Sequence, residues 1–361
     1  MENFKLKDIY SPDFVRTFAE LVQRRYSPFP TETFIAAVLD DSWNAKELKE
    51  RMRHITLCLR KYLPQHYSEA LDVLMEIAPE CNGFPYMFFP DFVEQFGLRD
   101  EDSSIAALEL FTQYSSAEFA IRPFILKNPV KIMSQMRIWS EHPNHHIRRL
   151  ASEGCRPRLP WAIALKDFQR DPAPVLPILE HLKTDESEYV RRSVANNLND
   201  ISKDHPALVL EIAERWKGQH SDTDRILKHA LRTLLKRGNM RALALFGFQT
   251  ANNVDISISD LKFLKNSVNI GDSVNFSFDI QVNKESALRL EYGVYYVKAS
   301  GEAVRKVFFL HEKEYATNST NTITRKLSFQ QRTTRKHYAG KHRLTIIVNG
   351  KELAETAIEV Q

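Results

Sequence analysis

The chain has 361 residues, 43% of them hydrophobic, and a net charge of +4 with a pI near 8.8. This length allows two or three domains, and eleven glycines exclude a glycine-rich or low-complexity protein. Three widely spaced cysteines, Cys58, Cys81 and Cys155, argue against a disulfide framework and against a cysteine-based zinc site. The first ten residues contain no apolar run, and no segment approaches about eighteen apolar residues, so we expect a cytoplasmic protein without a membrane span.

Apolar residues recur with helical spacing between residues 11 and 245, which predicts a long helical region. A break is expected at Ser27–Pro30, because proline cannot continue a helix. The stretch 82–92 (NGFPYMFFPDF) contains two prolines among its aromatic residues and is predicted to be a loop. A later helix is expected to begin at Glu118 and to end at Leu126.

Part of this helical region is a sequence repeat. Ile147-Arg148-Arg149-Leu150 returns as Val190-Arg191-Arg192-Ser193 after 43 positions, and Leu227-Lys228-His229-Ala230 is a weaker third copy. Helical pairs that repeat at about 40 residues are typical of HEAT-type arrays, which are superhelical and offer a concave surface. We therefore predict an all-α HEAT-like repeat solenoid with a concave binding face.

The repeats also place polar residues on one helix face. Arg149 and Glu153 are four positions apart, as are Arg192 and Asn196, and residues at this spacing are neighbours on a helix. Successive repeats therefore present a basic residue followed one turn later by a hydrogen-bonding residue. Either a binding surface or an exposed face with ordinary ion pairs would produce this pattern.

After residues 247–254 the apolar spacing changes from helical to alternating. The alternating segments are 274–282, 288–296, 307–309, 327–329 and 344–348. Gly271-Asp272 and Asn349-Gly350 are turn dipeptides, and the second is typical of a two-residue hairpin. Six or seven short strands predict an all-β immunoglobulin-like sandwich. We expect it to occupy residues 249–361, after a HEAT-like domain at 1–248.

Residues 122–170 carry ten Lys or Arg against three acids, a local charge of +7. In a repeat array this charge favours a phosphate-binding track, and the alternative is a solvated basic face without a ligand. Glu153 lies in the densest part of the run, where a carboxylate opposes phosphate binding. It either pairs with Arg149 or Arg156, or it acts chemically by stabilising developing positive charge or by orienting a water.

Two further residues near this run are candidates for a site. Glu118, in SSAEFAIRPF, is at a predicted helix start, where the helix dipole favours a carboxylate whatever its function. Trp161 is either a core residue or the wall of a site that holds a cationic group. The histidines at 142, 145 and 146 lack a second ligand cluster, so a polar loop is favoured over a metal site.

The run HPNHHIRRLASEGCRPRLPW (142–161), with SSAEFAIRPF before it and DESEYVRRSVANNLND after it, resembles the AlkC branch of the AlkC/AlkD alkylpurine DNA glycosylases. These are bacterial DNA alkylation repair enzymes built from HEAT-like repeats. The resemblance covers residues 5–245 and is most specific at 115–200. A C-terminal immunoglobulin-like domain is similar to the one that a subset of this branch carries.

The resemblance implies a monofunctional DNA glycosylase that hydrolyses the N-glycosidic bond of cationic alkylated bases in duplex DNA without full base flipping. The implied substrates are 3-methyladenine and, as a second candidate, 3-methylcytosine. No cofactor and no metal are implied, and we expect a monomer associated with the bacterial nucleoid. The family's catalytic positions correspond to Glu118, Glu153, Trp161 and Asp200. The residues expected to bind DNA are Arg122, Arg148, Arg149, Arg156, Arg158, Arg192 and Asn196.

Two other classes of function stay open. A non-catalytic DNA-binding HEAT-repeat protein would bind duplexes without releasing a base, and a protein–protein scaffold would have no duplex affinity. Glu153 within the basic run favours the enzyme, because a pure binder gains nothing from it. The sandwich carries a basic set that leads us to expect a clamp on DNA: Lys326, Arg332, Arg335, Lys336, His337, Lys341, His342 and Arg343.

Overall fold

The computed structural model describes residues 5–331 and 335–361, which form two compact units. The first unit contains Met1–His205 and Gly218–Ala230, and the second contains Pro206–Lys217 and Leu231–Gln361. Within the described residues, no helix is long and apolar enough to cross a membrane.

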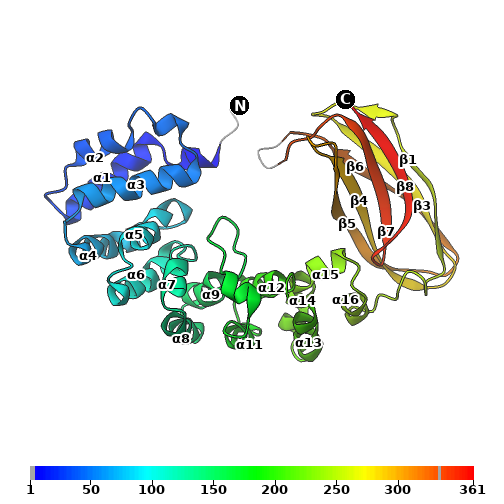
Figure 1. Ribbon diagram of the computed structural model, residues 1–361, viewed down its shortest axis with the longest axis horizontal. Helices are drawn as coiled ribbons and strands as arrows, with labels where there is room; N and C mark the ends of the chain where they lie inside the picture. The colour runs from blue at the N-terminus through cyan, green and yellow to red at the C-terminus, as the bar shows by residue number, and fades with distance from the viewer. Residues whose placement is uncertain (1–4, 332–334) are drawn as a thin grey trace. The chain divides into compact units, whose positions relative to one another are not determined.

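Sixteen α-helices precede the strands in the described part of the chain, as the expected helical region requires (Figure 1). They are α1 (Pro12–Arg25), α2 (Thr31–Val38), α3 (Leu48–Tyr62), α4 (Tyr67–Ile77), α5 (Phe88–Phe96), α6 (Glu101–Tyr114), α7 (Ile121–Lys127), α8 (Pro129–Ser140), α9 (His145–Gly154), α10 (Lys166–Arg170), α11 (Leu176–Leu182), α12 (Glu188–Ile201), α13 (Pro206–Trp216), α14 (Ser221–Ala230), α15 (Arg232–Lys236) and α16 (Met240–Leu245). The 3₁₀ helices are η1 (Leu6–Ile9), η2 (Trp43–Ala45), η3 (Ala78–Glu80) and η4 (Phe84–Met87).

Local sequence explains where several of these helices begin. The side chain of Ser11 accepts a hydrogen bond from the Phe14 amide at the start of α1. Asn144 accepts one from the His146 amide at the start of α9. Such caps satisfy amides that have no partner within the helix, which is why serine and asparagine are favoured there.

The expected loop at 82–92 is wrong, because most of this stretch is helical. Residues 84–87 form η4, and α5 follows directly from Phe88. Pro85 and Pro90 lie in the first turns of these helices, where a proline's missing amide is not needed. The aromatic side chains pack inward, since Phe88, Phe89 and Phe92 are buried.

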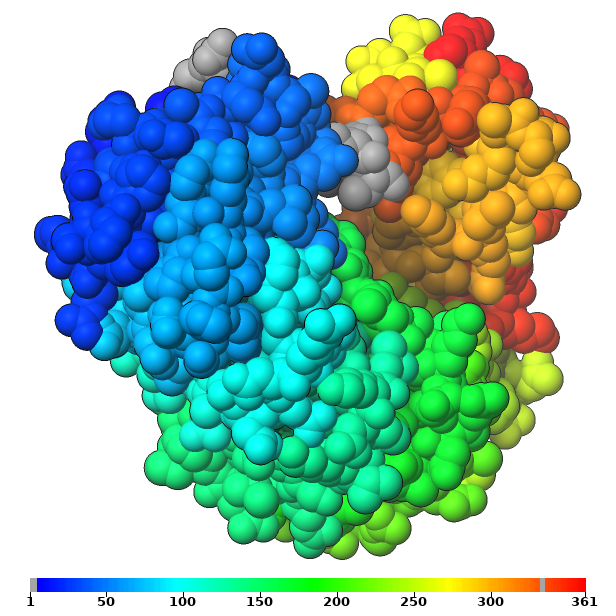
Figure 2. Space-filling model, turned by 60° about the vertical axis from the view of Figure 1, so that its left-hand side comes forward, coloured from blue at the N-terminus to red at the C-terminus, as the bar shows by residue number. Residues whose placement is uncertain are grey.

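The first unit contains the HEAT-like repeats that the 43-residue spacing predicts. The two Arg-Arg motifs lie in the N-terminal halves of α9 and α12, and these two helices pack against each other. In turn α12 packs against α14, which carries the third copy of the motif. Helices α8 and α11 also pack against α9. The space-filling view shows side chains closing the gaps between successive helices of this unit (Figure 2).

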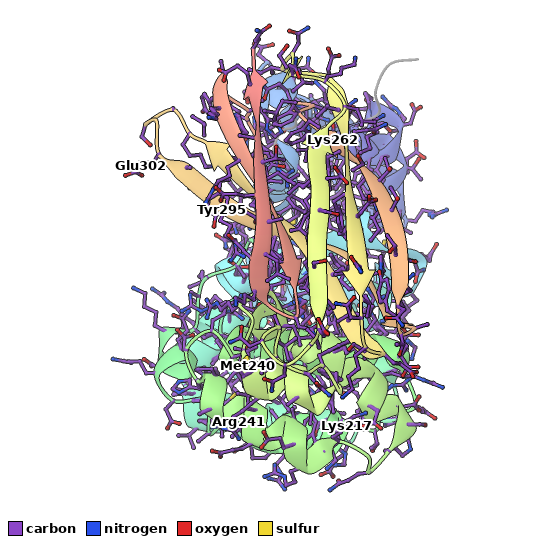
Figure 3. All side chains as sticks on the ribbon, turned by 90° about the vertical axis from the view of Figure 1, so that its right-hand side faces the viewer. Lys217, Met240, Arg241, Lys262, Tyr295 and Glu302 are labelled. Carbon is purple, nitrogen blue, oxygen red and sulfur yellow. The ribbon has the colours of Figure 1, made fainter. Side chains whose placement is uncertain are left out.

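The second unit contains a β-sandwich of two sheets (Figure 3). The strands are β1 (Ile256–Phe263), β2 (Ser267–Val268), β3 (Ser273–Val282), β4 (Ser286–Val297), β5 (Ala303–Tyr315), β6 (Ser319–Ser328), β7 (Gly340–Val348) and β8 (Lys351–Val360). One sheet has the order β1-β3-β6 and the other β2-β8-β7-β4-β5. Lys262 and Tyr295, which Figure 3 labels, belong to different sheets.

The alternating segments predicted from the sequence fall on β3, β4, β5, β6 and β7. The apolar members of β3 and β4 form the core between the sheets, with Phe276, Ile280 and Leu290 fully buried. The predicted alternating segments include neither β1 nor β2, and β8 follows only from the hairpin expected at Asn349-Gly350. Of the basic set expected to contact DNA, His337 and His342 are buried, and Arg332 lies outside the described residues.

The expected hairpin at Asn349-Gly350 joins β7 to β8, and both residues have positive φ, as this kind of turn requires. The Asn349 side chain accepts from the Arg289 amide and donates to the Gln249 carbonyl. Gly350 lies against Gly238. The approach is so close that a Cβ added to Gly350 would be 2.4 Å from the Gly238 Cα. The hairpin thus packs closely on the segment between α15 and α16.

The boundary predicted between residues 248 and 249 lies between Leu245, where α16 ends, and Ile256, where β1 begins. Helices α13, α15 and α16 nonetheless cluster with the strands rather than with the repeats. The boundary therefore stays a prediction.

Replacing Gly350 by alanine should lower the free energy of unfolding of the second unit by about 2–4 kcal/mol, because backbone strain and overpacking add. Gly301→Ala is the matched control, since Gly301 has φ +81° against +83° at Gly350 but nothing within 4 Å of its added Cβ. The control should lose only about 1 kcal/mol. Denaturant unfolding of both variants measures the difference, and equal losses would contradict the importance of the close approach.

Candidate active site

A cavity of about 620 Å³ opens in the first unit beside the start of α9. Its walls come from segments that are distant in the sequence: residues 82–87, the end of α6, the turn after it, α9, Trp161 and α12. Aromatic side chains contribute much of the wall, and Phe84 and Tyr189 are 42% and 43% exposed. Glu118 supplies a carboxylate to this lining.

Glu118 lies in the turn between α6 and α7, three residues before α7 begins. Its carboxylate accepts a hydrogen bond from the Ser116 hydroxyl and two from Arg149, at 3.1 and 3.3 Å. Only 11% of the Glu118 side chain is exposed. These hydrogen bonds and the ion pair with Arg149 hold the carboxylate in one orientation at the cavity wall.

Arg149 connects the two carboxylates that the sequence singled out. It pairs with Glu118 and lies 3.6 Å from the Glu153 carboxylate. Burial alone would lower the pKa of Arg149, but the charges of Glu118 and Glu153 outweigh burial and raise it. The guanidinium also lies 4.8 Å from the ring centroid of Tyr189, a cation–π contact that fixes its plane.

Glu153 is buried behind Arg149, with 5% of the residue exposed. One oxygen accepts from Arg156 at 2.6 Å, and the other accepts from the Ser193 hydroxyl at 2.7 Å. It is not among the residues that line the cavity. Of the two interpretations drawn from the sequence, the structure shows the first, because Glu153 pairs with Arg149 and Arg156.

Asp200 continues this arrangement into α12. It is 2% exposed, accepts from Arg156 at 2.9 Å and pairs with Lys203 at 2.9 Å. Acidic and basic side chains therefore alternate from the cavity wall into the protein, and we call this set the charge chain. Its members are Glu118, Arg149, Glu153, Arg156, Asp200 and Lys203.

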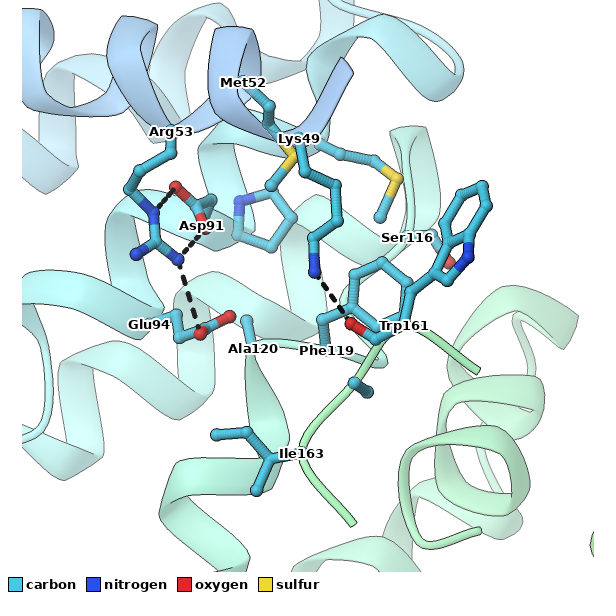
Figure 4. Close-up of a pocket in the computed structure, with 13 residues that line it drawn as sticks. Lys49, Met52, Arg53, Asp91, Glu94, Ser116, Phe119, Ala120, Trp161 and Ile163 are labelled. Carbon is cyan, nitrogen blue, oxygen red and sulfur yellow. Dashed lines mark hydrogen bonds and ion pairs between the residues drawn. The ribbon is translucent and has the colours of Figure 1, made fainter. Parts of the chain in front are cut away.

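Trp161 lies in the loop between α9 and α10 and is 67% exposed, so it is not a core residue. Its φ is +66°, a left-handed conformation that is uncommon for a residue other than glycine. The Lys49 ammonium of α3 donates to its carbonyl at 2.7 Å, and Figure 4 shows the indole pointing away from Lys49. Trp161 also lines the cavity that contains Glu118.

Comparison with known proteins supplies the family. The model described as "Uncharacterised protein YhaZ, C-terminal Ig-like domain" matches residues 257–361. A Bacillus subtilis (strain 168) protein described as "Uncharacterized protein YhaZ" is 48% identical over 346 residues, 96% of each chain. The Pseudomonas fluorescens alkylpurine DNA glycosylase AlkC, solved bound to DNA containing an abasic site analog, is 37% identical with a TM-score of 0.93, covering 99% of this chain and 100% of that one.

The chain belongs to the AlkC branch of the AlkC/AlkD family. The resemblance seen in the sequence is thereby confirmed, as is the fold of HEAT-like repeats followed by an immunoglobulin-like sandwich. The positions of the individual residues in this AlkC-family structure decide which of them a ligand can reach.

Three arginines expected to bind DNA are engaged inside the protein, and Arg156 of the charge chain is one of them, with 6% of the residue exposed. Arg122 is fully buried and donates to the carbonyls of Ile163, Gly154 and Arg156, at 2.5, 2.9 and 2.8 Å. Arg148 is 8% exposed and pairs with Asp185 in the next repeat. None of these three guanidinium groups can reach a phosphate in this conformation.

The net charge around the basic run (residues 122–170) is also lower in the folded protein than its sequence suggests. Five of its basic side chains pair with acids from outside the run. The pairs are Lys131–Asp102, Arg148–Asp185, Arg149–Glu118, Arg156–Asp200 and Arg158–Asp204. Arg158 and Asp204 form a partly exposed pair, and Asn196 is bonded to His229. Arg192 is exposed, and no ion pair involves it among the residues the structure describes.

Sequence reasoning missed Tyr189, although the repeat offered a signal. Tyr189 corresponds to His146 under the 43-residue spacing, and their rings lie 5.8 Å apart. Both residues line the cavity. Burial, His145 and Arg149 lower the pKa of His146, so this ring is neutral near pH 7. Within the described residues, no group of three or more His, Cys, Asp or Glu side chains could hold a metal ion, and this includes the three histidines of the run.

Replacing Arg156 by methionine should destabilise the first unit by about 3–5 kcal/mol, because it leaves the buried carboxylates of Glu153 and Asp200 without their shared partner. Arg158→Met is the control on the same loop. It breaks a pair whose side chains are 37% and 27% exposed, and it should cost no more than about 1 kcal/mol. Thermal unfolding compares the two, and similar losses would contradict the structural weight given to the charge chain.

Proposed function

We propose that the protein is a DNA glycosylase that hydrolyses the N-glycosidic bond of alkylated purines. The observation that carries the proposal is the placement of the Glu118 carboxylate in the wall of an open, aromatic-lined cavity, beside exposed Trp161. The likeness to a protein described as an alkylpurine DNA glycosylase, over the whole of both chains, supports the same reaction. The finer substrates we propose are cationic, with 3-methyladenine first and 3-methylcytosine second.

The residues suit this reaction chemically. A base methylated at N3 carries a positive charge and leaves as a neutral molecule, so no general acid has to protonate it. The sugar, in contrast, gains positive charge as the bond breaks. A fixed carboxylate near the anomeric carbon stabilises that charge and can orient a water for attack.

Within the site we assign the direct role to Glu118, because it lines the cavity. Glu153 and Asp200 act from behind, as the carboxylates that hold Arg149 and Arg156 in place. Trp161 offers an exposed aromatic face to a cationic base, an attraction worth about 0.5–2 kcal/mol. The cavity is open rather than a closed nucleoside pocket, which favours a lesion that stays in or near the helix over one that is fully flipped.

For the DNA backbone we propose contacts to Arg192, Arg158 and Asn196, which lie on accessible parts of the repeats. Arg149 is a conditional contact, because it must exchange Glu118 for a phosphate. The proposed ligand is duplex DNA containing alkylated bases, bound by a monomer without a cofactor. A partner-binding scaffold is disfavoured by the carboxylate and tryptophan at one cavity, which such a scaffold does not need.

One assay tests the function directly. The full-length protein is incubated with duplex DNA treated with a methylating agent, and released bases are identified by chromatography. Release of 3-methyladenine supports the glycosylase, and the amount of 3-methylcytosine orders the two substrates. Binding without release would support the non-catalytic alternative, and the absence of binding would support the scaffold.

Glu118→Gln should lower the single-turnover rate of 3-methyladenine release by a factor of about 100 or more, since it removes the charge but keeps the shape. Duplex affinity should change little, because the amide can still accept from Arg149. Glu141→Gln, at an exposed glutamate in the loop before α9, is the control for loss of one negative charge. A wild-type rate in Glu118→Gln would show that another group stabilises the transition state.

Arg192→Ala should weaken duplex binding uniformly across sequences and reduce the slope of log affinity against log salt by about 1. The single-turnover rate on saturating DNA should be unchanged, because Arg192 does not line the cavity. Arg225→Ala is the matched control, since Arg225 on α14 is paired with Asp222. Salt titrations of binding in the two variants measure the effect, and an unaltered slope in Arg192→Ala would exclude this phosphate contact.

A further inference from the structure

The loop from Cys155 to Leu165 carries Trp161, whose side chain is exposed and whose backbone is in the left-handed conformation. Little within the loop secures it. Its internal backbone bonds are Ala162 to Leu159 at 3.3 Å and Leu165 to Pro157 at 3.2 Å. The groups that fasten it come from elsewhere in the first unit.

One fastening is Arg122 on α7. Its guanidinium has no contact with solvent and donates to three backbone carbonyls, two at the beginning of the loop region (Gly154 and Arg156) and one directly after its tip (Ile163). A buried cation that satisfies carbonyls on both sides of a loop fixes the separation of the two sides. Arg122 therefore sets the width of the loop at its base.

The second fastening is Lys49, which is 112 positions before the residue that it holds. Its ammonium donates to the Trp161 carbonyl at 2.7 Å and lies 5.1 Å from the ring centroid of Phe119 (Figure 4). Phe119 directly follows Glu118 in the turn between α6 and α7. One ammonium thus contacts both the segment that carries Trp161 and the segment that carries Glu118.

We propose that Lys49 and Arg122 are positioning residues, which fix Trp161 relative to the Glu118 carboxylate. Arg122 sets the base of the loop, and Lys49 joins its tip to the Glu118 turn. The kinetic part of this proposal rests on the proposed glycosylase function, but the structural part does not. Misplacing a contact residue by about 1 Å is enough to slow an enzyme about a hundredfold.

The test uses full-length protein labelled with 5-fluorotryptophan and ¹⁹F NMR. The chain has four tryptophans, of which Trp43, Trp139 and Trp216 are buried and Trp161 is exposed. Trp161→Phe assigns the resonance of interest. Lys49→Met keeps the aliphatic stem but removes the donor, Lys49→Arg keeps a donor, and Lys61→Met on the same helix is the control. Lys61 is exposed and its contact is with Tyr62.

In Lys49→Met we expect the Trp161 resonance to move and sharpen while the other three stay in place. Single-turnover release of 3-methyladenine should fall about tenfold to a hundredfold with duplex affinity within about twofold, a loss from positioning rather than binding. Lys49→Arg should restore both readouts, and Lys61→Met should alter neither. Arg122→Lys should move the same resonance if it folds, and Lys49→Met decides the proposal if it does not.

Three results would overturn the proposal. A Trp161 resonance that is unmoved in Lys49→Met would show that Lys49 does not hold the loop. A moved resonance with an unchanged rate would show that the position of Trp161 does not matter. Loss of affinity alone would make Lys49 a phosphate contact. If wild-type protein releases no base, the glycosylase function fails, and the resonance still decides whether Lys49 fixes the loop.

Discussion

The cost of burying carboxylates governs the structure of the candidate site. Glu153 and Asp200 are almost entirely removed from solvent, and an isolated buried carboxylate would cost several kcal/mol. The charge chain meets this cost by alternation, because each of its acids has a guanidinium or ammonium within 3.1 Å. Since Arg149 and Arg156 each serve two acids, the chain is a single cooperative unit rather than a set of separate pairs.

This constraint also ties the fold to the site. Members of the charge chain come from the turn after α6, from α9 and the loop that follows it, and from α12 and the turn after it. Repeat packing brings these segments together, and the site in turn discourages any slip between repeats, because a shift would strand a buried charge. The carboxylate that reaches the cavity is thus oriented by residues up to two repeats away, which is the preorganisation that electrostatic catalysis requires.

Local sequence patterns predicted most of the fold but few of the ion pairs in the site. The 43-residue repeat located α9 and α12, and strict alternation located β3 and β4, since periodicity depends on near neighbours. The stretch 82–92 was misjudged because its prolines occupy first turns, where they break nothing. Partners such as Asp185 for Arg148 and Asp204 for Arg158 are 37 and 46 positions away. The +7 charge of the run therefore predicts a phosphate track, while in the fold five of its basic side chains pair with acids from outside the run.

The cysteines have a consequence for a protein proposed to act on methylated DNA. All three are buried and free, and burial raises the pKa of the Cys58 thiol to about 11 and those of Cys81 and Cys155 to about 12. Thiolates, not thiols, react fast with electrophiles. Methylating agents that create the proposed lesions would therefore find almost no cysteine thiolate on this chain. Buried thiols would leave the cysteines of the proposed enzyme unmodified under the same chemical exposure that creates its proposed substrates.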